Sequence, residues 1–159
     1  MYVERWAYQL NQIDNMISYN INESLTFNEY NNFLKRTDLG SQYPEENFKK
    51  RIAKLLENRS VSITARNENN LLIGVCFGLT DFSYFLFLTD LGVDRNYENQ
   101  GIGKELVHLA QREIGGEDDI IVVVLSNKNA IKFYKKCGYR TDSDLLLKPC
   151  KTWTDFTVE

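Results

Sequence analysis

The sequence predicts an α/β domain with three layers, in which helices lie on both faces of a central mixed sheet. Short apolar runs and alternating apolar and polar residues, typical of strands, are separated by segments whose apolar residues recur at helical spacing. No repeat or flexible linker divides this series. We therefore expect a single domain over 1–159, with an N-terminal extension (1–15), a core (16–148) and a C-terminal strand or tail (149–159).

The core is expected to open with a strand and two helices. A short strand is predicted at 16–21. Thr26-Phe27-Asn28-Glu29 has the form of a capping box that begins a helix ending near Gly40. A second helix is predicted to run from Pro44, which suits a first helical position, to Asn58.

The middle of the chain changes period and is expected to form three strands and a helix. Apolar and polar residues alternate over 61–65, a polar turn follows at 67–70, and an apolar run covers 71–79, which together indicate a hairpin. A further apolar run covers 84–93. The apolar face of the next segment, 102–114, predicts a helix that two glycines end.

The last part of the chain is expected to complete the sheet. The wholly apolar run 120–125 predicts a strand buried on both faces. A helix is predicted at 129–136, followed by final strands at 139–148 and 153–158.

Composition and charge exclude several classes of protein. The 19 Lys and Arg residues are scattered among 22 Asp and Glu residues, for a net charge of −3, so we expect binding neither to nucleic acid nor to an anionic membrane. No apolar run approaches the roughly 20 residues of a spanning helix, and the first residues lack the features of a signal peptide. We expect a soluble cytoplasmic protein. The three cysteines show no CxxC spacing, which predicts neither a disulfide framework nor a metal site.

The most informative motif follows the run 84–93. A polar loop leads into a helix whose first turn contains Gly101 and Gly103. Unpaired backbone N–H groups and the helix dipole at such a turn favour an anion such as a diphosphate, which the glycines allow to approach closely. Glycines at this position are equally compatible with a role as packing spacers.

Two other phosphate-binding motifs do not match this segment. A Walker loop requires Ser or Thr after Gly103-Lys104, where Glu105 stands, and a glycine where Glu98 stands. A dinucleotide fingerprint requires a third glycine where Leu106 stands.

Two blocks of the sequence together resemble the GNAT superfamily of N-acetyltransferases. After a strand ending in Val93, the segment Glu98-Asn-Gln-Gly101-Ile-Gly103 is similar to the family's acetyl-CoA signature, Arg/Gln-x-x-Gly-x-Gly/Ala. The family's later block, Asn-x-x-Ala-x-x-x-Tyr-x-x-x-Gly-Phe/Tyr, is matched by Asn127, Ala130, Tyr134, Gly138 and Tyr139. The resemblance implies a GNAT-like three-layer α/β/α domain with a central mixed, mostly antiparallel sheet.

The resemblance also implies how acetyl-CoA is bound. The backbone of Leu91 and Val93 is expected to pair with the pantetheine arm, and Asn127 to contact the same arm. The pyrophosphate is expected on the loop amides of Asn99, Gln100, Gly101, Ile102, Gly103 and Lys104.

Two residues are the candidates for acid and base. The resemblance implies that Tyr134 protonates the departing CoA thiolate, since a phenol with an ordinary pKa near 10 is protonated at neutral pH; the alternative is a buried aromatic on a short helix. Asp90 matches a position where the family often has an acid that relays a proton through water; the alternative is a hydrogen-bonded strand residue. Asp81 and Tyr84 are weaker candidates for the substrate mouth, and His108 is expected at the surface.

One residue departs from the family pattern. Glu98 stands where the family usually has Arg or Gln, and its carboxylate is expected to oppose pyrophosphate binding unless it points to solvent. Compensating charge is sought in Lys104, Arg95 or Lys128.

The resulting hypothesis is an N-acetyltransferase that moves acetyl from acetyl-CoA to a primary amine by direct attack in a ternary complex. The acceptor is expected to be a small metabolite, and the alternative is a catalytically silent acyl-CoA-binding or interaction module on the same fold. The extension 1–15 has apolar residues at helical spacing, suited to docking on the domain or on a second subunit of a homodimer. Five aromatic residues are expected to line an acceptor pocket or to pack in the core: Phe27, Tyr30, Phe33, Tyr43 and Phe82.

Overall fold

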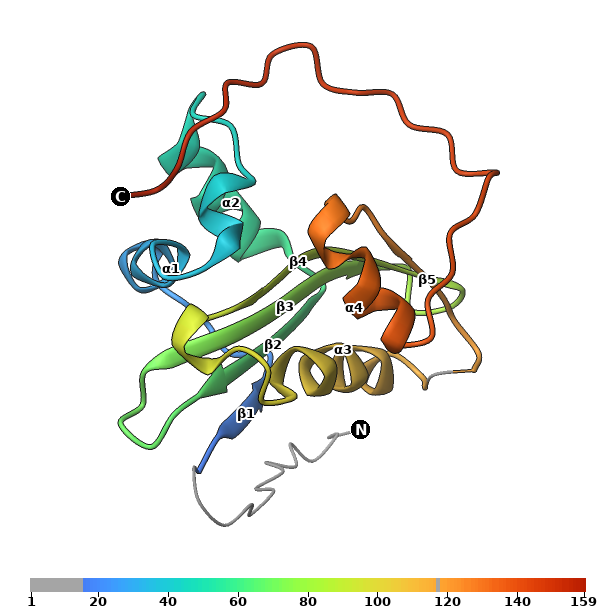
Figure 1. Cartoon of the computed structure of the whole chain (residues 1–159), viewed down its shortest axis with the longest axis horizontal. Coiled ribbons are helices and arrows are strands. Elements are labelled where there is room, and N and C mark those ends of the chain that lie inside the picture. The colour runs from blue at the N-terminus through green and yellow to red at the C-terminus, as the bar shows by residue number, and fades with distance from the viewer. Residues whose placement is uncertain (1–15, 117) are drawn as a thin grey trace.

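A computed structural model describes residues 16–116 and 118–159 of the chain (Figure 1), so the predicted extension 1–15 lies outside the described residues. Its sheet has the strand order β1-β2-β3-β4-β5. The first three pairings are antiparallel and β4 pairs with β5 in parallel, which confirms a mixed, mostly antiparallel sheet. The strands are β1 (Ser18–Ile21), β2 (Val61–Arg66), β3 (Leu72–Thr80), β4 (Phe85–Val93) and β5 (Ile121–Val124).

Helices cover both faces of this sheet and confirm the three layers. The α-helices are α1 (Phe27–Leu34), α2 (Phe48–Asn58), α3 (Ile102–Glu113) and α4 (Ile131–Lys136). Three short 3₁₀ helices connect them: η1 (Asp38–Ser41), η2 (Arg95–Tyr97) and η3 (Lys128–Ala130). One apolar core joins α3 to the sheet, with Phe133 of α4 packed against it, and a second core joins α1 and α2 to the opposite face. No helix within the described ranges is both long and apolar enough to span a bilayer.

Thr26 caps α1 as predicted, but the Glu29 carboxylate pairs with Arg66 (2.8 Å), and the start of α2 also differs from the prediction. The Thr26 hydroxyl accepts a hydrogen bond from the Glu29 amide (3.2 Å). The prediction of Pro44 as a first helical position is wrong, because Asn47 has a left-handed backbone (φ 55°) and α2 begins only at Phe48. Pro44 instead forms an isolated antiparallel bridge with Asp155.

Two predictions for the C-terminal part are also wrong. Within the described residues β5 is the last strand of the sheet and has no neighbour beyond it, so Ile121 is 60% exposed and the strand is not buried on both faces. The segments 139–148 and 153–158 form no strand. After Gly138 the chain runs in an exposed arc from α4 towards α1 and α2 (Figure 1), where the Val158 amide donates to the Gly40 carbonyl (3.0 Å).

A β-bulge in β4 determines which side chains face which helix layer. Leu88 pairs with Gly78 of β3, but Asp90 pairs with Phe77, so Thr89 is the additional residue. Before the bulge, Leu88 points into the core under α3. After it, a Cβ built on Gly92 meets Leu39 of η1, on the opposite face. The bulge thus turns Asp90 towards the α1 and η1 layer.

Charged groups attach this end of β4 to α1. Asp94 is 1% exposed and forms an ion pair with Arg36, just after α1. The Arg36 guanidinium also donates to the Leu72 carbonyl (2.9 Å), and Asp94 accepts from the Asn96 amide (2.9 Å). These bonds hold the helix layer over the part of β4 that follows the bulge.

The close approach of η1 to β4 at Gly92 gives a stability prediction. A Cβ at position 92 would lie 2.6 Å from Leu39 Cδ1 and 2.9 Å from Leu39 Cγ, so Gly92→Ala is expected to lower the free energy of unfolding by about 1–3 kcal/mol in urea denaturation. Leu39→Ala removes both of these atoms. The double variant should therefore lose at least about 0.5 kcal/mol less than the sum of the two single variants; strictly additive losses would contradict the contact.

Candidate active site

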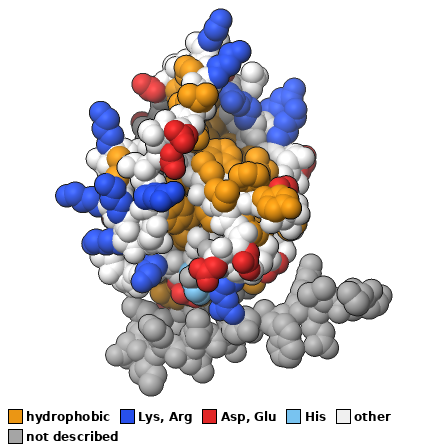
Figure 2. Space-filling model, turned by 90° about the vertical axis from the view of Figure 1, so that its right-hand side faces the viewer, with side chains coloured by type: hydrophobic (Ala, Val, Ile, Leu, Met, Phe, Trp, Pro, Cys, Tyr) orange, Lys and Arg blue, Asp and Glu red, His pale blue; other side chains and the backbone are white. Residues whose placement is uncertain are grey.

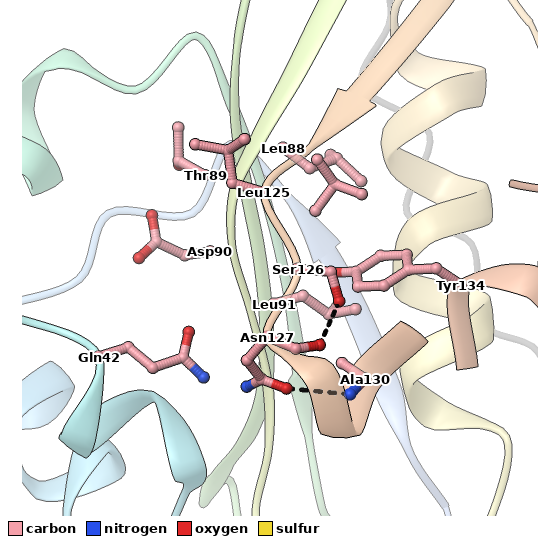
Figure 3. A pocket seen from close by; sticks show the side chains of 11 residues that line it. Gln42, Leu88, Thr89, Asp90, Leu91, Leu125, Ser126, Asn127, Ala130 and Tyr134 are labelled. Carbon is pink, nitrogen blue, oxygen red and sulfur yellow. Dashed lines mark hydrogen bonds between the residues drawn. The ribbon is translucent and has the colours of Figure 1, made fainter. Parts of the chain in front are cut away.

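The candidate site lies where β4 and β5 separate. Their parallel pairing ends at Leu88 and Val124, so among the residues that the structure describes no strand lies against this edge of β4 after the bulge. A small open pocket occupies this position (Figure 3). Its lining residues come from the position after η1, from β4, from the end of β5 and the turn that follows it, and from η3 and α4: Gln42, Leu88, Thr89, Asp90, Leu91, Val124, Leu125, Ser126, Asn127, Ala130 and Tyr134.

The open edge of β4 presents backbone hydrogen-bonding groups. The Asp94 amide donates to the Ile73 carbonyl of β3 (2.8 Å). Because backbone groups of successive residues in an antiparallel pair point alternately towards and away from the partner, those of Val93 and Leu91 point away from β3. They face the side that β5 has left.

Asp90 is the buried acid of the site. Its side chain is 4% exposed, Oδ1 accepts a hydrogen bond from the Tyr43 hydroxyl, and Oδ2 has no partner among the described residues. The Tyr43 oxygen in turn lies 2.8 Å from that of Tyr30. Burial raises the pKa of Asp90, and the side-chain interactions with Thr89 and Tyr43 oppose this by favouring the carboxylate. Asp90 is therefore a buried acid at the pocket wall that is held in place by Tyr43.

Tyr134 lies on the opposite wall of the pocket, on α4. Its side chain is 7% exposed and points into the pocket (Figure 3). Its ring packs edge-on against Phe133 and Tyr139, with centroid distances of 5.1 and 5.3 Å. Burial raises the pKa of Tyr134, so the phenol is protonated at neutral pH and able to donate. Tyr134 thus packs as a buried aromatic residue and also lines the pocket.

Asn127 begins the turn that leads into α4. Its Oδ1 accepts from the Ala130 amide (2.9 Å), and the neighbouring Ser126 hydroxyl donates to the Asn127 carbonyl (2.8 Å; Figure 3). The carboxamide nitrogen of Asn127 remains available as a donor at the pocket wall.

The glycine turn at the start of α3 presents a row of free amides. The first bond of the helix joins the Glu105 amide to the Gly101 carbonyl (3.0 Å), and the amides of 99–104 have no acceptor within the described part of the chain. Asn99 and Gly101 have left-handed backbones, with φ of 62° and 82°. A Cβ at Gly103 would lie 3.3 Å from Phe133 of α4. Gly101 thus shapes the turn, whereas Gly103 also serves as a packing spacer.

The charged side chains near the glycine turn differ in whether they are free to interact with a bound pyrophosphate. Glu98 is exposed, as are Lys104 and Lys128. Arg95 does not serve as compensating charge, because its guanidinium pairs with Asp38 (3.2 Å) and donates to backbone carbonyls at the end of α1.

The structure places two of the weaker candidates outside the pocket and adds two residues to the site. Asp81 and Tyr84 lie at the tip of the β3–β4 hairpin, where the Asp81 carboxylate accepts turn amides, and neither lines the pocket. Sequence reasoning missed Gln42 as a pocket residue and the bond from Tyr43 to Asp90.

Most of the remaining aromatic candidates pack in the core instead of lining the pocket. Tyr30 and Phe33 are fully buried in the core, Phe27 packs at its edge, and Phe82 is exposed in the β3–β4 turn. His108 lies half-buried on α3 and does not line the pocket. The described residues contain no cluster of side chains suited to a metal ion.

A sequence profile of the acetyltransferase (GNAT) family matches residues 26–139. The chain belongs to this family. Its members use acetyl-CoA, and the free amides of 99–104 and the open edge of β4 fit the diphosphate and the amide-containing arm of that molecule.

Two curated relatives match part of this GNAT domain. A histone acetyltransferase of Glycine max is 29% identical over 83 residues, which cover 49% of this chain and 34% of that protein. An uncharacterized N-acetyltransferase of Gracilaria tenuistipitata var. liui is 27% identical over 79 residues, covering 50% of this chain and 43% of that protein. The matches thus span less than half of the length of these relatives.

Solved structures show the same fold at low sequence identity. A GNAT-family protein of Streptococcus pneumoniae has a TM-score of 0.65 at 18% identity, over 86% of this chain and 100% of that one. An aminoglycoside N-acetyltransferase in complex with CoA has a TM-score of 0.64 at 13% identity, over 90% of this chain and 100% of that one.

The exposed carboxylate of Glu98 gives a binding prediction. Glu98→Gln removes a negative charge beside the free amides, so acetyl-CoA is expected to bind about two- to fivefold more tightly in titration calorimetry at low salt, and the gain should shrink as salt is added. Glu113→Gln removes the same charge at the far end of α3 and should leave the affinity unchanged. Unchanged or weaker binding by the Glu98 variant would contradict the prediction.

Proposed function

We propose that this chain transfers an acetyl group from acetyl-CoA to a primary amine of a small metabolite, by direct attack in a ternary complex. The observation that carries the proposal is the separation of β4 from β5, which opens a pocket between a buried carboxylate and a buried phenol. The row of free amides at the start of α3 supports it from the side of the coenzyme.

In this proposal the coenzyme lies along the open edge of β4. The amides of 99–104 hold the pyrophosphate at the start of α3, where the helix dipole favours negative charge. The pantetheine arm then pairs with the outward-facing backbone of Val93 and Leu91, and Asn127 donates to it from the opposite wall. This places the acetyl group beside Asp90 and Tyr134.

Asp90 and Tyr134, on the two walls of the pocket, then act as base and acid. Asp90 accepts a proton from the ammonium of the acceptor, through water, and the neutral nitrogen attacks the acetyl carbonyl. The tetrahedral oxyanion is stabilised by the Val93 amide. The C–S bond breaks and Tyr134 donates its proton to the thiolate. The nitrogen loses its second proton, which returns to the Tyr134 phenolate through water, and Asp90 releases its proton to water. The products are the N-acetylated amine and CoA.

A silent acyl-CoA-binding module is the second candidate, and Glu98 is the observation that favours it. A carboxylate next to the free amides weakens the site that a catalyst would optimise. The two candidates differ in turnover, since the silent module binds CoA but releases no thiol with any amine.

The role of Tyr134 gives an activity prediction. Tyr134→Phe keeps the ring that packs against Phe133 and Tyr139 but removes the proton donor, so kcat is expected to fall by about 10²-fold in a free-thiol release assay. The Kd for CoA should stay within about twofold. Full activity of the variant would exclude Tyr134 as the acid, and no thiol release by the wild type with any amine of a broad panel would favour the silent module.

The hydrogen bond from Tyr43 gives a pH prediction. The bond favours the carboxylate, so Tyr43→Phe should raise the pKa of Asp90 further. Because activity requires the carboxylate, the rising limb of the kcat/KM profile should move to higher pH, by roughly one unit. Asp90→Asn should abolish the limb and most of the activity. Tyr84→Phe, at an exposed tyrosine outside the pocket, is the control; a limb that stays in place in Tyr43→Phe would contradict the coupling.

A further inference from the structure

An uncovered apolar face of the sheet lies beside the pocket. We name it the apolar platform, and it consists of Leu79, Phe85, Phe87, Ile121 and Leu125, which are between 36% and 60% exposed. Figure 2, which views the side of the molecule at the right of Figure 1, shows apolar side chains gathered in the middle of that face. Single exposed apolar residues are common, but a contiguous group on one sheet face indicates a binding surface.

The strand register places these side chains side by side. Leu79 of β3 pairs with Phe87 of β4, and Phe85 pairs with Ile121 of β5. Leu86 and Leu88 point into the core under α3, as do Val122 and Val124. Because side chains alternate along a strand, Phe85, Phe87 and the odd-numbered residues of β5 share the opposite face.

The helix layer on that face ends just before the platform. Phe77, two residues before Leu79, is fully buried, with the Tyr30 ring at 5.4 Å and the Arg59 guanidinium at 4.7 Å from its ring. Leu79 is 47% exposed. The cover provided by α1 and α2 therefore stops between these two residues and leaves the ends of β3, β4 and β5 open.

The platform is continuous with the pocket. Leu125 belongs to both, and Thr89, on the same strand face as Phe87 up to the bulge, lines the pocket. At about 3.3 Å per residue, Phe87 lies about 7 Å and Phe85 about 13 Å along β4 from Thr89. A ligand whose reactive group lies in the pocket therefore needs only one ring or a short chain to reach the platform.

The distribution of charge specifies the ligand. Asp90 is the only charged residue in β3, β4 and β5. From these three strands, a ligand on this face therefore meets one carboxylate at the pocket and mainly apolar side chains elsewhere. Several ammonium or hydroxyl groups placed on the platform would lose their hydration without gaining partners.

We infer that the apolar platform binds the body of the acceptor, and that the acceptor is a monoamine with an aromatic or aliphatic body. This inference rests on the proposed acetyl transfer and specifies its substrate class. The ammonium group enters the pocket beside Asp90, and the apolar body lies over Phe87 and Leu125. Such a ligand satisfies both the single carboxylate and the uncovered apolar face.

The test compares matched amines in the thiol-release assay. The wild type should show a kcat/KM at least tenfold higher for 2-phenylethylamine than for ethanolamine, and for hexylamine than for 2-(2-aminoethoxy)ethanol, a polar amine of similar length. Phe87→Ser should lower kcat/KM for the apolar amines about tenfold or more, while the polar amines and the Kd for CoA change less than twofold. Equal use of both kinds of amine, or no effect of the variant, would overturn the inference while leaving acetyl transfer intact.

A pair of leucines at opposite ends of β3 supplies the control. Leu79 and Leu71 are 47% and 44% exposed, but Leu71 precedes β3 and lies away from the platform. Leu79→Ser should reproduce the selective loss with apolar amines, and Leu71→Ser should not. Equal effects of the two variants would contradict a local role for the platform.

Two further measurements distinguish binding of the acceptor at the platform from the proposed acetyl transfer and from a dimer interface at the same surface. NMR titration of the CoA complex with 2-phenylethylamine should perturb platform signals, and Phe87→Ser should abolish this. If that holds without any thiol release, the platform stands and the proposed transfer fails. If light scattering shows a dimer that Phe87→Ser dissociates without altering amine preference, the platform is an interface between copies of the chain, and the inference is overturned.

Discussion

The departure of β4 from β5 is the constraint on which the site depends. Up to Leu88 and Val124 the two strands pair in parallel, and beyond them β4 continues beside β3 alone. Backbone amides and carbonyls in a folded protein need partners, so an edge left open inside the molecule is costly unless a ligand completes it. The bulge at Thr89 adds a second consequence, because it turns Asp90 to the face opposite that of Leu88. The separation of the two strands thus provides the open edge, and the bulge places the acid beside it.

Burial gives the two facing groups their complementary states. Asp90 and Tyr134 are both almost inaccessible, and in both cases burial raises the pKa. The raised pKa keeps the Tyr134 phenol protonated until a thiolate accepts the proton. For the carboxylate it increases the affinity for a proton, while the hydrogen bond from Tyr43 keeps the charged form accessible. The same layer that buries Asp90 ends before Leu79, so the polar chemistry and the apolar surface meet at the pocket.

Local signals in the sequence predicted most of the fold and the motifs of the site, and the failures have physical causes. The helix cap at Thr26 and the run that forms β4 act within a few residues, so the pattern alone reveals them. The exposure of β5 and the loss of the final strands depend on which strand ends the sheet, a property of the whole assembly. The bond from Tyr43 to Asp90 joins residues 47 positions apart, and the bulge that permits it leaves no mark in an apolar run. Leu79 and Phe87 read as core residues, because only the extent of the helix layer reveals that they are uncovered.

The most direct measurement of the central claim is the backbone amide NMR spectrum of the chain during titration with CoA. If the open edge of β4 and the turn before α3 hold the coenzyme, the largest shifts should fall on Leu91, Val93 and the amides of 99–104, and the same amides should gain protection from hydrogen exchange. The amides of β1, at the opposite edge of the sheet, should not respond. Saturable binding that leaves the amides of Val93 and Gly101 unchanged, or no binding at millimolar CoA, would contradict the account.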